Sequence, residues 1–512
     1  MNSLITNLIM ICIIGVSVLI YFMNNPVGHS KDYRMRCFLN WFPLGLTYAF
    51  LYMGRYNLTV SKSALEGLMS NEQFGTIFGV GALIYGFAFL INGPLTDRIG
   101  GRKAILIASL GASVMNCLMG IVTYLVLNGR IDSRNLTVIF SILYALNMYF
   151  QSYGAVAVVK VNSFWFHVKE RGIVGGIFGT LISLGLYFAF DWGDTIVRAT
   201  ELAPKAPLGI IEHVIRPFMI SESAKIAPTW FVFFIPSGIL FLFFIMDLFI
   251  VKDRPGEAGF EDFDTGDASS GEMDKEFTSL ELFKKLLTNP TVLTIAFIEF
   301  CSGILRNGVM HWYHIFMNQM ESKIADPQKY SFPLYNIFTG QPENCPDLHI
   351  YEGAKFFIDN WGLLLCFAGI FGGFASGFIS DKLFQSRRGP SAVFMYIIMI
   401  VAIIIMNFVL ITNQFALGII LVIISLCVIG VHGILSGTAT ADFGGRKAAA
   451  TAVGLVDGFV YLGTALQSTA LGYLTTKNWH YWPLFLIPFS VIGLILAIRI
   501  WAAMPDSKKG HH

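Results

Sequence analysis

Long apolar segments recur along the whole chain, at lengths that suit helices crossing a bilayer. A helix needs about 20 mostly apolar residues to cross a hydrocarbon core of about 30 Å. None of these segments alternates apolar and polar residues as the strands of a membrane barrel do. We therefore predict an all-α polytopic membrane protein with thirteen spans. Their expected limits are 4–23, 38–58, 74–96, 103–127, 136–160, 172–191, 229–251, 290–316, 358–380, 390–412, 414–440, 447–472 and 481–503.

The composition strengthens this interpretation and excludes several functions. Only 13% of the 512 residues are charged and 55% are apolar, whereas soluble domains contain about 25% charged residues. A net charge of +2 gives no electrostatic basis for nucleic-acid binding. The sequence has no Walker A motif, no His/Cys cluster with metal-ligand spacing and no polar stretch long enough for a soluble domain. We expect neither an enzyme nor a bound cofactor or metal.

The charged residues divide the chain into segments. Residues 1–30 contain no Lys, Arg, Asp or Glu and no Ala-x-Ala cleavage site, so we interpret them as an uncleaved anchor helix, with a retained signal peptide as the alternative. Six predicted helices at 31–251 and six at 290–505 flank an acidic linker at 252–289, and a tail follows at 506–512. Fifteen Lys and Arg of the short loops lie on the side of the linker and tail, against four on the other side. The positive-inside rule therefore predicts a cytoplasmic C-terminus.

A short motif occurs at corresponding places in the two sets of six helices. Residues 93–103 join the second helix to the third and read G-P-L-T-D-R-I-G-G-R-K, and residues 377–382 repeat the pattern as G-F-I-S-D-K. The glycine lets two helices approach closely, and the aspartate at a helix end can hold a neighbouring helix. We predict that these loops form clips that break and re-form as the two halves move. The clip residues are Gly93, Asp97, Arg98, Arg102, Asp381 and Lys382.

The spacing G-x-x-x-D-[RK]-x-G in the first of these loops resembles the signature loop of the major facilitator superfamily. The second loop repeats the spacing as far as G-x-x-x-D-[RK]. This resemblance implies a major facilitator fold of two six-helix bundles with pseudo-two-fold symmetry, to which the chain adds one N-terminal transmembrane helix. It also implies a substrate site near the midplane and alternating access.

Two arginines lie inside predicted spans. Arg55 is in the first of the twelve core helices, and Arg306 is in the seventh, its counterpart in the second half. An arginine at a helix centre costs about 2.5–3.5 kcal/mol on insertion scales, so it normally faces a cavity or a partner. Guanidinium groups favour bidentate contacts with phosphate and carboxylate oxygens, which predicts anion binding. Snorkelling toward the interface and structural contacts with carbonyl groups are the alternatives.

The surrounding residues resemble the organophosphate:phosphate antiporter family, which includes glycerol-3-phosphate and hexose-phosphate transporters. The matching segments are Y-x-x-x-Y-x-x-R-x-N at 48–57, L-R-x-G-x-x-x-W at 305–312, F-Q-x-x-G at 150–154, K-E-R-G at 169–172, S-D-K at 380–382 with R-G at 388–389, and K-A-A at 447–449 followed by Y-L-G at 461–463. By this resemblance Arg55 and Arg306 are the paired phosphate-binding arginines. Tyr48 and Tyr52 would line the same site.

The chain departs from the glycerol-phosphate transporter pattern at two positions. Phe89 stands where that pattern has a lysine, and the histidine expected near Ile182 is missing. The identity of the organic phosphate is therefore left open.

Other polar residues within the spans have two interpretations each. Lys160 and His311 are candidates for substrate binding, with snorkelling and packing as the respective alternatives. His432 and Asp457 are candidates for proton coupling, because imidazole exchanges protons near neutral pH and a buried carboxylate can bind one. We interpret Glu299 and Asp457 as the two acids deepest in the spans.

Together these features predict a secondary active transporter that exchanges a sugar phosphate or glycerol phosphate for inorganic phosphate by alternating access. The expected location is the bacterial inner membrane, where the chain would act as a monomer in contact with lipid. A proton-coupled symporter of another organic anion and a transporter-like membrane sensor of a phosphate ester are the alternatives. Two long loops on the other side from the linker, at 192–228 and 317–357, are assigned no role.

Overall fold

The computed structural model describes residues 3–65, 67–167, 169–204, 207–221, 223–265, 288–346, 348–385, 387–439 and 449–502. Several predictions lie outside this part of the chain. They concern most of the acidic linker, the tail, the first two residues of the K-A-A segment, and four basic residues of the topology count, namely Arg446, Lys447, Lys508 and Lys509.

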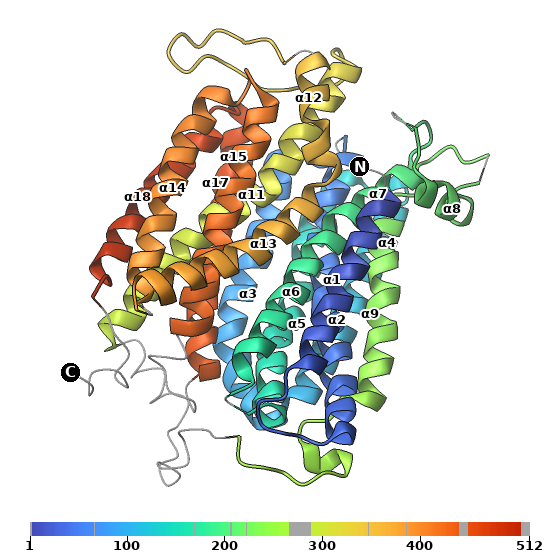
Figure 1. The fold of residues 1–512 in the computed structure, drawn as a ribbon. Helices are drawn as coiled ribbons and strands as arrows, with labels where there is room; N and C mark the ends of the chain where they lie inside the picture. Colours follow the sequence, from blue (N-terminus) through green and yellow to red (C-terminus); the bar gives the residue numbers. More distant parts are fainter. Residues whose placement is uncertain are drawn as a thin grey trace. The chain divides into compact units, whose positions relative to one another are not determined.

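The described chain is built from helices, and no strand is present in the ranges just given (Figure 1). The long helices are α1 (Ser3–Met23), α2 (Lys31–Ala64), α3 (Asn71–Ile99), α4 (Gly101–Leu127), α5 (Leu136–Trp165), α6 (Arg171–Tyr187), α9 (Phe231–Ile250), α11 (Pro290–Ala325), α13 (Trp361–Phe378), α14 (Arg388–Val409), α15 (Gln414–His432), α17 (Ala449–Lys477) and α18 (Tyr481–Arg499). Shorter helices are α7 (Gly193–Thr200), α8 (Ile210–Met219) and α12 (Leu348–Asp359), with 3-10 turns η1 (Ser133–Asn135) and η3 (Pro255–Ala258). Three π-helical segments extend long helices: η2 (Phe188–Trp192), η5 (Ile379–Leu383) and η6 (Gly433–Ala439).

Each of the thirteen predicted spans coincides with a helix, so the all-α polytopic prediction is confirmed. Within the described residues, eleven helices are long and apolar enough to cross a membrane. The two long helices that do not meet this criterion are α2 and α17. In α2 the buried length carries Arg55, Asn57 and Lys62, which lower its mean hydropathy. The helix that bears the first candidate arginine is thus also one of the least apolar.

The chain forms two compact units. The first comprises Met1–Ser61 and Ala88–Ser279, and the second comprises Lys62–Phe87 and Leu280–His512. The first part of α3 is therefore counted with the second unit, where Tyr85 packs against Tyr461 with ring centroids 4.2 Å apart. The predicted domain limits at 31–251 and 290–505 stay a prediction.

In the first unit, the N-terminal helix α1 is fastened to other helices by polar contacts. The Tyr187 and Thr6 hydroxyls lie 3.0 Å apart, and Trp192 Nε1 donates to Asn7 Oδ1 at 2.9 Å. Arg34 at the start of α2 donates to the carbonyl oxygen of Phe22 at 2.8 Å. The predicted anchor helix thus has specific contacts at both of its ends.

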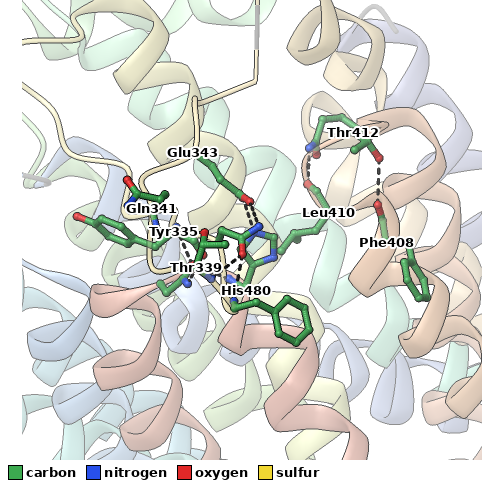
Figure 2. A network of polar contacts seen from close by, with 12 residues as sticks. Tyr335, Thr339, Gln341, Glu343, Phe408, Leu410, Thr412 and His480 are labelled. Atoms are coloured by element: carbon green, nitrogen blue, oxygen red, sulfur yellow. Dashed lines mark hydrogen bonds and ion pairs between the residues drawn. The ribbon is translucent and has the colours of Figure 1, made fainter.

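In the second unit, the long loop between α11 and α12 is docked on the turn between α17 and α18 (Figure 2). Glu343 Oε2 lies 2.8 Å from His480 Nε2, and the Trp479 amide donates to the carbonyl oxygen of Pro333 at 3.0 Å. The side-chain amide of Asn478 (Nδ2) donates to the carbonyl oxygen of Tyr335 at 2.6 Å. Much of the loop predicted at 317–357 therefore has a defined local structure.

The docking of this loop should depend on pH through Glu343. The hydrogen bond from His480 holds the pKa of this carboxyl below its ordinary value of 4.5, although partial burial raises it. A hydrogen bond from Asn336 lowers the pKa further. Because the folded pKa is lowered, the contact stabilises the docked loop above that ordinary value and is lost as pH falls through the lowered one. We expect Glu343→Gln to increase hydrogen exchange in residues 326–346 at neutral pH. The charge-matched Glu352→Gln, on an exposed position of α12, should leave exchange unchanged, and equal exchange in the two variants would contradict this role.

Candidate functional site

Arg55 is fully buried in the first unit, where side chains of α2 and α5 hold its guanidinium. Its Nε donates to Gln151 Oε1 at 3.0 Å. Its Cζ lies 4.7 Å from the ring centroid of Tyr52 and 5.9 Å from that of Tyr56. Tyr48, one turn before Tyr52, packs edge-on against it at 5.7 Å. A cation over aromatic faces is attracted by the ring quadrupoles, so the tyrosines help to stabilise the buried charge.

A chain of amides behind Arg55 fixes the position of Gln151. Gln151 Nε2 donates to Asn147 Oδ1 at 3.1 Å, and Asn147 Nδ2 donates to the carbonyl oxygen of Gly54 at 3.0 Å. Asn116 of α4 donates to the same two acceptors, at 3.2 and 3.1 Å, and accepts from Asn57 at 2.6 Å. Because each amide orients the next, the Gln151 oxygen is held toward the guanidinium. Gln151 and Asn57 belong to the sequence motifs at 150–154 and 48–57, whereas Asn116 and Asn147 were not among the predicted site residues.

The final glycine of the F-Q-x-x-G segment explains how α5 reaches α2 at this point. A Cβ on Gly154 would lie 2.8 Å from Leu51 Cδ1 and 3.1 Å from Tyr48 Cδ2. Such a Cβ would be closer than side chains normally approach, so a larger residue here would require the Leu51 side chain to move. The Gln151–Arg55 contact lies one turn earlier on the same face of α5.

Arg306 lies in the second unit on α11, a helix buried along most of its length. The residue after it, Asn307, donates to Thr464 Oγ1 of α17 at 2.8 Å. The indole of Trp482 in α18 donates to the carbonyl oxygen of Gly308 at 2.7 Å. Arg306 itself is partly exposed between these buried neighbours. The backbone that carries it is therefore fixed by two neighbouring helices.

His311, the second candidate on α11, is buried and packed. Its Nε2 lies 3.2 Å from Asn307 Oδ1, and its ring lies 4.5 Å from the ring of Phe78. These contacts fit the packing interpretation, while substrate binding by His311 stays a prediction.

The first predicted clip contains an ion pair between two helices. Asp97 near the end of α3 accepts from Lys160 of α5 at 2.8 Å, with the two side chains 33% and 24% exposed. Lys160, a candidate for substrate contact, therefore has a carboxylate partner within the first unit. Arg102 adds a second contact, because its backbone amide donates to Asp253 Oδ1 at 2.8 Å beyond the end of α9. Arg98 is exposed, and Gly93 is buried in α3.

The second clip is local by comparison. Asp381 in η5 accepts from Arg388 at the start of α14 at 2.9 Å, and the same guanidinium nitrogen lies 2.9 Å from Ser380 Oγ. Lys382 is exposed. The repeated aspartates thus bind different partners, one across helices and one across the adjoining turn.

In the transporter that the sequence predicts, the Asp97–Lys160 pair should matter more to transport rate than to stability. Partly exposed ion pairs contribute about 0–1 kcal/mol to stability. We expect Asp97→Lys, which places two cations together, to slow substrate uptake more than Asp97→Asn does. The exchanged pair, Asp97→Lys with Lys160→Asp, should recover part of the rate in an initial-uptake assay. No recovery would show that Asp97 acts through another partner.

Two acids of the second unit bind residues at the end of α15. Glu299 of α11 lies 2.8 Å from His432, and Asp457 of α17 accepts a short hydrogen bond from Ser436 in η6. Glu299 is fully buried and Asp457 only partly, and their depth in the spans stays a prediction. A further acid, Asp247 of α9, is fully buried as well. Thr47 of α2 donates to it at 2.7 Å. Asp247 lies four residues before the end of the predicted span, so its position in the sequence did not indicate that it is buried.

Comparisons with known proteins agree with this architecture. A family model described as Major Facilitator Superfamily matches residues 44–191, which include Arg55 and the first clip. A solved bacterial homologue of the human lysosomal transporter Spinster, in an inward-facing and occupied conformation, superposes with a TM-score of 0.62 at 14% identity. That match covers 92% of this chain and 97% of the other.

Curated relatives extend over nearly the whole length. The glycerol-3-phosphate transporter of Bacillus subtilis is 24% identical over 481 residues, covering 92% of this chain and 93% of the relative. A probable hexose phosphate transport protein of Chlamydia pneumoniae is 23% identical, with 92% of each chain covered. The membrane sensor protein UhpC of Escherichia coli is 21% identical, with 89% of each covered.

The protein is thus a multi-pass membrane protein with the major facilitator fold. Its resemblance to the organophosphate:phosphate antiporter family, drawn above from the motifs around the two arginines, is confirmed by these relatives.

Proposed function

We propose that the protein carries an organic phosphate across the membrane by alternating access, in exchange for inorganic phosphate. The observation that carries this proposal is the buried guanidinium of Arg55, held by Gln151 above the ring of Tyr52. A phosphate ester has about −1.5 to −2 charge near pH 7 and three acceptor oxygens, which suit the planar donors of a guanidinium. Arg306, the corresponding residue of the second half, would supply the other cation.

We propose exchange of one anion for another because a bound anion favours the change of access. A bound anion adds counter-charge beside the buried Arg55 guanidinium, so we infer that the change of access is favoured while an anion is bound. A protein that changes access only with an anion bound must return with another one, and inorganic phosphate has the same recognition chemistry. The Asp97–Lys160 and Asp381–Arg388 pairs are the contacts that would yield during the change.

The decisive experiment uses purified protein in vesicles loaded with inorganic phosphate. We expect uptake of labelled glycerol 3-phosphate or hexose 6-phosphate that requires internal phosphate. Empty vesicles and protein-free vesicles are the controls. Absence of counterflow with a broad panel of phosphate esters would overturn the proposal, and saturable binding without any flux would favour a sensor like the relative from Escherichia coli.

The proposed setting is the inner membrane of a bacterium, with the C-terminus in the cytoplasm and the monomer as the functional form. The relatives from Bacillus and Chlamydia support a bacterial membrane, and the basic loops of the sequence support the orientation.

A further inference from the structure

A carboxylate and an imidazole meet inside the second unit, on helices α11 and α15. Glu299 Oε2 lies 2.8 Å from His432 Nδ1, with the glutamate side chain 0% exposed and the histidine 24% exposed. The other carboxylate oxygen of Glu299 is buried and has no hydrogen-bond partner among the described residues. A buried carboxylate is costly unless a proton or a cation neutralises it. The partly exposed imidazole is the group through which such a proton can arrive.

The helices packed around this pair bring only a few titratable or polar groups near it. Tyr396 of α14 donates to the carbonyl oxygen of Ile298, the residue before Glu299, at 3.1 Å. On α17, the helix that carries Asp457, the ring of Phe459 lies 5.3 Å from that of Phe297. Helix α18 has no titratable residue between 483 and 498. Cys301 of α11 and Tyr396 of α14 lie close enough to interact electrostatically with Glu299. Ser436 of η6 holds Asp457 of α17, and α11 also carries Arg306.

Arg306 is the only arginine or lysine in this set, and it lies on the same face of α11 as Glu299. Seven residues separate them, which is about two helical turns or roughly 10 Å along the axis. The net charge of the Glu299–His432 pair therefore acts on Arg306 through a low-dielectric interior. With neutral imidazole the pair is negative and competes with a bound anion for the guanidinium. With protonated imidazole the pair is neutral and no longer competes with an anion for Arg306.

The chain after His432 is irregular. The α15 helix continues as the π-helical segment Gly433–Ala439, and Ser436 of this segment holds Asp457. Such segments occur often at functional sites because they shift the register of a helix. Here the segment follows His432, which contacts Glu299, and contains Ser436, which contacts Asp457.

We propose that Glu299 and His432 form a proton-binding site that is loaded and unloaded in the transport cycle, so that a proton moves with the phosphate ester. This inference rests on the function proposed above. The proton comes from solution, binds the pair with the ester, and leaves to solution on the other side when the ester does. The return step with inorganic phosphate takes place with the pair unprotonated, so that a proton moves net with the ester. By linkage, proton binding and anion binding favour each other equally.

The test measures two signals from the same vesicles, loaded with inorganic phosphate and a pH-sensitive dye and supplied with labelled glycerol 3-phosphate. Wild-type protein should give label uptake and a change in internal pH. Glu299→Gln should keep uptake of label and lose the part of the pH change that the protein itself carries. Ionisation of the two phosphates changes the internal pH equally for every variant, so the difference from wild type isolates the proton carried by the pair.

A matched control comes from the second Glu–His pair of the same unit. Glu343 and His480 also lie 2.8 Å apart but belong to a loop and a turn outside the spans. Glu343→Gln should therefore behave as wild type in both signals.

The outcomes separate this inference from the proposed function. No label uptake by the wild type overturns the function, whereas label uptake with identical pH signals in wild type and Glu299→Gln overturns the proton site. His432→Gln guards against misfolding of Glu299→Gln, because it alters the partly exposed partner and should lose the same signal. If both variants fail to fold, the wild type alone decides, since an uptake rate that does not vary between about pH 5 and 8, where imidazole exchanges its proton, also overturns the proposal.

Discussion

Replacing either Arg55 or Arg306 by alanine is expected to abolish phosphate-ester uptake while leaving a folded protein. Hydrogen bonds to charged groups contribute about 1.5–3 kcal/mol each, and every 1.4 kcal/mol is about tenfold in affinity. A bidentate contact comprises two such bonds, so its loss should weaken binding by at least about 100-fold. Substrate-induced thermal stabilisation and counterflow both measure this loss.

Lysine at these positions is the sharper test, because it keeps the charge and removes the planar fork. In Arg55→Lys the bond from Nε to Gln151 is lost as well, so we expect uptake to stay well below that of wild type. Arg130→Ala, in an exposed loop after α4, is the matched control and should transport normally. Full activity of Arg55→Lys would mean that only positive charge is needed, and full activity of Arg55→Ala would remove this residue from the site.

The sequence predicted the features that depend on one helix at a time. Apolar length gave all thirteen helices, and an arginine inside a span identified Arg55 and Arg306 as candidates. The repeated G-x-x-x-D-[RK] spacing was visible because both copies lie in continuous segments. These features can be recognised without knowing which helices are neighbours.

The contacts that define the environment of each candidate could not be predicted in this way. Gln151 is 96 residues from Arg55, and Asp97 is 63 residues from Lys160. His432 is 133 residues from Glu299, so the two were predicted as separate candidates. In the structure they form one pair. In a membrane protein every span is apolar, hence hydropathy says little about which face of a helix meets which neighbour.

The second large effect is expected where α11 and α17 touch, at Gly303 and Gly463. A Cβ on Gly303 would overlap the carbonyl oxygen of Val460, and a Cβ on Gly463 would overlap that of Phe300. Since the obstacles are backbone atoms of a neighbouring helix, no side chain can turn aside to make room. The two glycines therefore set the distance between the helix that carries Arg306 and the helix that carries Asp457.

We expect Gly303→Ala and Gly463→Ala each to destabilise the protein by at least the 1–3 kcal/mol or so that overpacking a core costs. The measurement is thermal unfolding in detergent, followed by uptake in vesicles for any variant that folds. Gly373→Ala is the matched control, because α13 leaves open space around that position and alanine favours a helix by about 0.5–1 kcal/mol. Equal melting temperatures for Gly303→Ala and Gly373→Ala would show that α11 and α17 can separate without loss. In that case the α11–α17 contact, which includes the Asn307–Thr464 bond, would not be what holds Arg306 in position, and the fixed backbone behind the proposed anion site would have to come from Trp482 of α18.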